Sequence, residues 1–64
     1  MTVQELRDVR LHQTLYHSGV SMHCEVIEVT LSRVVVRWVD GSLGFLPFAA
    51  LGTEGGWLDS MGVV

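Results

Sequence analysis

Residues 34–51 read VVVRWVDGSLGFLPFAAL, and this stretch decides the fold that the sequence predicts. Three consecutive valines and a tryptophan favour a β-strand, because β-branched and aromatic side chains suit a pleated surface. Alternation places Val34, Val36 and Trp38 on one face of that strand. Since the opposite face also carries valines, we expect a central strand that is covered on both sides.

A hairpin is expected directly after this strand. The Asp-Gly dipeptide at 40–41 predicts a tight turn, because Asp tolerates left-handed backbone and Gly has no Cβ. A second strand is expected over 43–46, and Pro47 ends it, since proline has no N–H to donate to a sheet. Residues 48–51 (FAAL) suit one turn of helix, with Gly52 placed to stop it.

The segment before the hairpin is expected to form a helix that covers the sheet, followed by a first strand. Thr2 and Glu5 stand at the spacing of a capping box, in which each side chain accepts the other residue's backbone N–H. This spacing predicts a helix over 3–10, although the sequence leaves open whether that segment is a strand. A first strand is expected within 11–17, with a turn at 18–19.

The most regular strand pattern covers residues 20–31. Apolar and polar residues alternate up to Val26, after which Ile27 begins an apolar set of the opposite phase. A slip of one residue in a period-two pattern indicates a bulge or a strong bend. Small barrels need such bends to close, so the slip favours a barrel.

The end of the chain combines a glycine-rich segment with apolar residues. Residues 52–56 are flexible by composition, whereas Trp57 and the residues after it are too apolar for a solvated tail. We expect a last strand there, or a tail that docks on the barrel or on a neighbouring subunit. The prediction is thus a single domain over 1–64, with 1–10 as a helical cover and 52–64 as tail or last strand.

Size and composition indicate a small domain that needs additional stabilisation. The chain has 64 residues, of which 48% are hydrophobic and only 17% are charged. A core of this size rarely supplies more than about 3–5 kcal/mol of net stability, so disulfides, metals or partner subunits usually add to it. Cys24 is the only cysteine, which excludes an internal disulfide. We therefore expect self-association, since large apolar patches are uncommon on monomers.

The charge and the lengths of the apolar runs limit the classes of partner and the cellular location that we expect. The formal net charge is −3, and the four basic residues are all arginines. Because phosphate-driven binding needs clustered positive charge, nonspecific DNA binding is disfavoured, and only a local arginine patch stays open as an alternative. No apolar run reaches the roughly 18–20 residues of a membrane span, and no basic-then-apolar leader is visible. We expect a cytoplasmic protein without a membrane partner.

Four residues carry metal-ligand or nucleophile chemistry: His12, His17, His23 and Cys24. Their spacing contains neither CxxC nor HxxxH. Adjacent His23 and Cys24 point to opposite faces of a strand, so the first cannot serve as a base for the second. We therefore predict no catalytic residue, no metal, no cofactor and no small-molecule substrate, which makes the protein a non-enzyme. Cys24 is interpreted as a small core residue and the histidines as surface positions.

The segment GFLPFAAL, preceded by a Trp-containing strand and an Asp-Gly turn, resembles the SH3-like group of small β-barrels. In that group the fourth strand and the following 3-10 turn read roughly Gly-Tyr-Ile-Pro-x-x-Tyr-Val. The residues that match in kind are Gly44, Phe45, Leu46, Pro47 and Leu51. Tudor- and KOW-type members look closer, since they share a valine-rich strand followed by Trp, Asp and Gly. The resemblance implies a mainly β, five-stranded SH3-like barrel with a short N-terminal helix or turn and a 3-10 turn after Pro47.

A second resemblance competes with the first. The S1-type OB-fold has a third strand that commonly ends in Gly-Phe-Leu-Pro-x-x-x-Leu, which residues 44–51 also resemble. This resemblance implies that Phe45 lies on an RNA-stacking face. The sequence leaves the choice between SH3-like and OB-like strand order open, because both place the hairpin similarly.

The candidate binding surface combines aromatic rings with arginines: Trp38, Phe45, Trp57, Arg33 and Arg37. Aromatic side chains stack on bases and anchor protein partners, although Trp38 and Phe45 have filling of the core as an alternative role. Both arginines are expected to form cross-strand pairs with Glu25 or Glu28. The predicted function is a protein-interaction or adaptor module that self-associates. The alternative is an S1- or KOW-like protein that binds RNA or another single-stranded nucleic acid.

Overall fold

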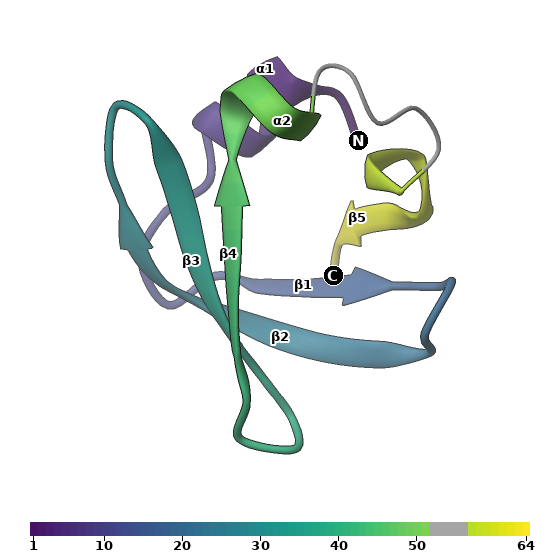
Figure 1. Ribbon diagram of the computed structural model, residues 1–64. Helices are drawn as coiled ribbons and strands as arrows, with labels where there is room; N and C mark the ends of the chain where they lie inside the picture. Colours follow the sequence, from purple (N-terminus) through teal and green to yellow (C-terminus); the bar gives the residue numbers. More distant parts are fainter. Residues whose placement is uncertain (52–56) are drawn as a thin grey trace.

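The structure is a computed structural model that describes residues 1–51 and 57–64. Its elements, in chain order, are α1 (Val3–Arg7), β1 (Thr14–His17), β2 (Met22–Val29), β3 (Arg33–Trp38), β4 (Leu43–Pro47), α2 (Phe48–Leu51), the 3-10 helix η1 (Leu58–Ser60) and β5 (Met61–Val63). The strands of the described residues form one five-stranded antiparallel sheet in the order β4-β3-β2-β1-β5 (Figure 1). The expected mainly β domain with a short N-terminal helix is confirmed.

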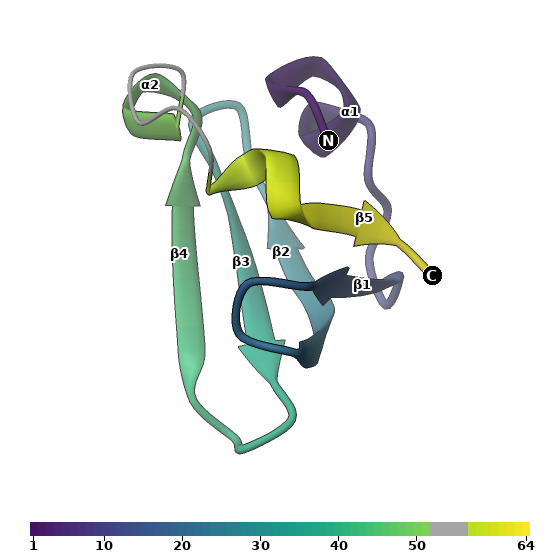
Figure 2. The same ribbon diagram turned by 90° about the vertical axis from the view of Figure 1, so that its right-hand side faces the viewer.

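The sheet is strongly curved, but its described strands do not close into a complete barrel, so the closure expected from the phase slip is not observed. β4 and β5 are the two edges and do not pair with each other (Figures 1 and 2). Part of the reason lies in β5, where the N–H of Met61 already bonds to Leu58 O. The carbonyl of Met61 accepts from the backbone nitrogen of Met1 at 2.7 Å. With both groups occupied, β5 has little backbone left to offer β4.

Helix α1 begins as the capping box predicts. The Oγ1 atom of Thr2 accepts the Glu5 N–H at 3.1 Å, and Glu5 Oε1 accepts the Thr2 N–H at 3.0 Å. The helix ends at Arg7, earlier than the expected residue 10. Beyond Arg7, the backbone N–H of Arg10 donates to the side chain of Gln13 at 3.0 Å. The Arg10 N–H therefore has a hydrogen-bond acceptor without a continuing helix.

The predicted phase slip is a bulge in β2. Register with β3 shifts between Val26 and Glu28, so that Ile27 is the extra residue. Such a bulge bends its strand and increases the local twist. β2 pairs with β1 on one side and with β3 on the other. In Figure 1 the β1–β2 hairpin runs across the view, whereas the β3–β4 hairpin runs up it.

The β3–β4 hairpin also forms as predicted. Trp38 N–H donates to Ser42 O at 2.8 Å, and Gly41 N–H donates back to Trp38 O at 2.9 Å. Gly41 has φ +91°, a left-handed conformation that suits glycine because it has no Cβ. All three valines of β3, residues 34–36, are buried, as expected for a strand covered on both sides.

The residues after Pro47 form a helical turn, but it is α-helical. The 3-10 turn expected at this point lies instead at η1, after Trp57. Of the two alternatives for the end of the chain, a strand is present as β5. The predicted helix stop at Gly52 and the predicted flexible segment 52–56 lie outside the described residues.

One cluster of buried side chains fills the concave side of the sheet: Leu6, Val9, Leu15, Cys24, Val26, Val34, Val36, Leu46, Phe48, Leu58 and Met61. Helix α1 contributes Leu6, which is fully buried, so the N-terminal segment is a structural cover. Cys24 is a core residue as predicted, and burial raises the pKa of its thiol. Within residues 1–51 and 57–64, no helix is long and apolar enough to cross a membrane.

Candidate binding groove at the β4 edge

A groove of about 420 Å³ runs along β4 on the concave side of the sheet, and we call it the β4 groove. Its lining residues come from the β3–β4 hairpin, from α2 and from the start of η1: Trp38, Gly44, Phe45, Leu46, Pro47, Ala50, Leu51 and Trp57. The three predicted aromatic residues are therefore brought to one place. Because the lining is almost entirely apolar and includes strand backbone, the groove suits an extended apolar ligand.

A single glycine lets the Trp38 ring lie against the backbone of β4. Gly44 faces Val36 in the register of the hairpin. A Cβ atom at Gly44 would lie 2.7 Å from Trp38 Nε1 and 3.1 Å from Val36 Cγ2. Any larger residue would displace the ring, so glycine at this position sets the shape of the groove.

Replacing Gly44 by alanine is expected to destabilise the domain by about 1–3 kcal/mol, because the new methyl group overpacks the contact with Trp38. The displaced indole should also shift its N–H resonance in NMR spectra. Gly62→Ala is the matched control, since a Cβ there would meet no atom of residues 1–51 or 57–64 within 4 Å. Equal unfolding midpoints for the two variants in urea would contradict the proposed contact.

His17 fixes the far wall of the groove and was not predicted to do so. It is 3% exposed, so the interpretation of all three histidines as surface residues is wrong for this one. Its ring lies 4.3 Å from the Trp57 ring and 6.3 Å from the Trp38 ring, centroid to centroid. His17 Nε2 is 2.9 Å from the carbonyl of Trp57, and since a carbonyl only accepts, Nε2 carries the proton. The Nδ1 atom is buried and has no hydrogen-bond partner among the described residues.

A weak sequence signal for His17 did exist. Leu15 and His17 are two residues apart in the first expected strand, so they point to the same face. Leu15 is fully buried, and the same face buries His17. A histidine two positions from a core leucine has a greater chance of burial than one in a turn, such as the exposed His12.

Phe45 lies at the groove rim with its side chain on the convex face. It is 55% exposed, so filling of the core, the alternative role considered for it, is wrong. The Arg33 guanidinium carbon lies 5.3 Å from the centre of the Phe45 ring. Arg33 also pairs with Glu28 at 3.6 Å, as the sequence predicted. The rim at Phe45 thus carries the positive charge of Arg33, which is shared between the Phe45 ring and Glu28.

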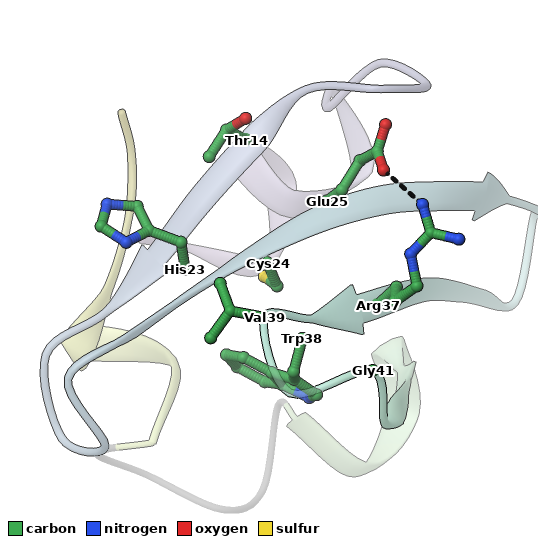
Figure 3. Close-up of a pocket in the computed structure, with 8 residues that line it drawn as sticks. All are labelled: Thr14, His23, Cys24, Glu25, Arg37, Trp38, Val39 and Gly41. Carbon is green, nitrogen blue, oxygen red and sulfur yellow. Dashed lines mark hydrogen bonds and ion pairs between the residues drawn. The ribbon is translucent and has the colours of Figure 1, made fainter.

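Arg37 belongs to a different hollow, of about 340 Å³, on the other side of the hairpin (Figure 3). It donates to Glu25 at 2.8 Å, which confirms the predicted cross-strand pair. His12 contacts the second oxygen of Glu25 at 3.1 Å. These contacts from His12 and Arg37 hold the pKa of Glu25 below its usual range. Trp38 lines this hollow as well, but Phe45 and Trp57 do not, so Arg37 lies outside the β4 groove.

Among the described residues, the outer edge of β4 pairs with no other strand. Neighbouring antiparallel strands alternate between pairs that exchange hydrogen bonds and pairs that do not. The bond from Trp38 N–H to Ser42 O assigns the even-numbered residues of β4 to the bonds with β3. The N–H and C=O groups of Leu43 and Phe45 therefore point outward, while Pro47 can offer only its carbonyl. In both ribbon views β4 has a neighbouring strand on one side only (Figures 1 and 2).

The described residues bring together no group of three metal-ligand side chains. Cys24 is buried and its neighbour His23 is exposed, which agrees with their predicted opposite faces. What the described residues do build is an apolar groove beside an open strand edge.

These features define a small mainly β domain with one five-stranded antiparallel sheet whose β4 edge is open. No protein-family model, no curated protein and no solved structure matches the chain.

Proposed function

We propose that this protein is a non-enzymatic protein-interaction module that binds an extended polypeptide segment as an additional strand along β4. The observation that carries this proposal is that the backbone groups of Leu43 and Phe45 point away from β3 on the same edge as an aromatic groove. Strand addition uses main-chain hydrogen bonds for affinity and side-chain pockets at alternate positions for specificity. An SH3-like architecture in a cytoplasmic protein is part of the same proposal, supported by the five antiparallel strands and the lone buried Cys24.

The groove also defines the chemistry of the bound segment. One face of an added strand would meet Trp38, Leu51 and Trp57, and the other would meet Phe45. β4 itself carries no charged residue. The bound segment is therefore extended and apolar at alternate positions, with a tolerance for acidic residues near Arg33.

The alternative function is binding of single-stranded RNA on the same aromatic residues. Its support is that Trp38, Phe45 and Trp57 share one groove, as stacking platforms do. Against it, Arg33 and Arg37 already pair with glutamates, and the net charge is −3. Phosphate contacts would have to replace those pairs, so the protein-binding function has the stronger support.

Selection of peptides from a random dodecapeptide phage library on the immobilised protein tests the proposal. Selected peptides should be extended and apolar, should change the tryptophan fluorescence, and should slow hydrogen exchange of the Leu43 and Phe45 amides. Phe45→Lys should weaken binding by about tenfold or more, since anchors of this kind contribute about 1–2 kcal/mol or more. Leu31→Lys is the control, because Leu31 is 99% exposed in the β2–β3 turn and does not line the groove.

The same fluorescence titration with mixed-sequence single-stranded RNA, at low and at physiological salt, separates the two functions. A saturable change that weakens with salt would replace the protein-binding function with the alternative. Failure to select any peptide whose binding depends on Phe45, together with no response to RNA, would remove both.

A further inference from the structure

The open edge of β4 is complementary to itself. In an antiparallel pair of two copies related by a two-fold axis, Phe45 would oppose Phe45 of the second copy. Since both backbone groups of Phe45 point outward, that pair can exchange two hydrogen bonds. Leu43 would oppose Pro47 of the second copy, where the Leu43 N–H meets a carbonyl and the missing proline N–H leaves only a solvent-exposed acceptor unpaired.

Side chains and charges favour the same arrangement. The two Phe45 rings would be direct cross-strand neighbours on the convex face, and such aromatic pairs stabilise antiparallel sheets. Phe45 and Leu43 are 55% and 53% exposed, so both have surface to lose on pairing. No residue of β4 is charged, and the nearest cations, Arg33 and Arg37, each have a glutamate partner within their own chain. A second copy therefore brings no uncompensated charge to the edge.

The other edge of the sheet offers much less to β4. The bonds between β5 and β1 fall at the even-numbered residues, which leaves Met61 and Val63 pointing outward. Both backbone groups of Met61 are already used within the chain, by Leu58 O and the nitrogen of Met1. Only Val63 could pair with β4 of another copy. A head-to-tail assembly through β4 and β5 would thus rest on one residue pair, whereas the two-fold pairing uses three.

We propose that two copies of this chain pair through antiparallel β4 strands about a two-fold axis centred on Phe45, and so mask the edge that binds a partner. This inference rests on the proposed function, because the same edge serves both. A standard interface takes about 800 Å² from each partner, roughly a fifth of the 3960 Å² surface of this chain, and one short strand covers less. The dimer is therefore weak and reversible, and a partner segment displaces the second copy.

Chemical synthesis allows a test that leaves every side chain in place. The bond between His23 and Cys24 is a ligation site, so backbone N-methylation can be introduced at Phe45 or, as the matched control, at Val63. Both amides point away from the sheet, so neither change removes an existing strand hydrogen bond. Sedimentation over a concentration series measures self-association, and two-dimensional NMR spectra check that each variant is folded.

The unmodified chain should follow a monomer–dimer equilibrium. N-methylation at Phe45 should weaken dimerisation by about thirtyfold or more, since it removes both central hydrogen bonds, while the Val63 variant should dimerise normally. Should the Phe45 variant not fold, Leu43→Lys replaces it and is expected to be monomeric. A chain that stays monomeric at millimolar concentration, or species larger than a dimer that are lost on Val63 methylation, would overturn the two-fold pairing. Peptide binding by a strictly monomeric chain would overturn it and leave the proposed function intact.

Discussion

Leu15→Ala is expected to leave a large fraction of the molecules unfolded at room temperature. Leu15 is fully buried in β1, between the partner strands β2 and β5. Truncating a buried leucine to alanine costs about 2–5 kcal/mol, through lost transfer free energy and the cavity left behind. A core of this size supplies only about 3–5 kcal/mol in total, so one such change consumes most of it.

Circular dichroism during urea unfolding measures this effect, and Leu11→Ala is the matched control. Leu11 is 55% exposed in the turn before β1, so its truncation should change the free energy of unfolding by less than about 0.5–1 kcal/mol. A cooperative transition for Leu15→Ala near that of the unmodified chain would show that the β1 core contributes far less than its burial indicates.

Replacing His17 by alanine is expected to lower the free energy of unfolding by about 2–4 kcal/mol and to disorganise the β4 groove. The change removes the ring that contacts both Trp57 and Trp38, and it leaves the Trp57 carbonyl without its donor. Fluorescence of the two tryptophans should shift towards that of solvent-exposed indole. Peptide binding at β4 should weaken as well, because Trp57 loses its support.

His17→Phe separates the hydrogen bond from the ring contacts. Phenylalanine keeps an aromatic ring between the two tryptophans but cannot donate, so it should cost only the unsatisfied carbonyl, about 1–3 kcal/mol. In the unmodified chain, nitrogen chemical shifts should report a proton on Nε2 of His17. The described contacts of His17 would be wrong if the proton resided on Nδ1, or if alanine proved as stable as phenylalanine.

The sequence by itself determined those features that depend on neighbouring residues. Thr2 and Glu5 specify the start of α1, because a capping box is made within four residues. Gly41 specifies the hairpin turn through its left-handed backbone. The change of hydrophobic phase at Ile27 specifies the bulge, since alternation along a strand is a local property. The mainly β class followed from these features.

The predicted site was correct in its aromatic part and incomplete elsewhere. Trp38, Phe45 and Trp57 do line one groove, although the residues that shape it were not anticipated. Gly44 matters only because the Trp38 ring lies across it, and His17 only because Trp57 returns to β1 from 40 residues away in sequence. Contacts of this kind leave no periodic pattern in a sequence.

The tertiary structure alone decided whether the sheet closes and which edge stays open. The short β5 pairs with β1 on one side. On its other side, the N–H of Met61 donates to Leu58 O and its carbonyl accepts from the nitrogen of Met1, so β5 does not pair with β4. Strand pairing joins residues far apart in the chain, and its partners depend on which backbone groups are already occupied. The amino-acid sequence thus determined the strands, and long-range hydrogen bonding left β4 as the open edge on which the proposed function depends.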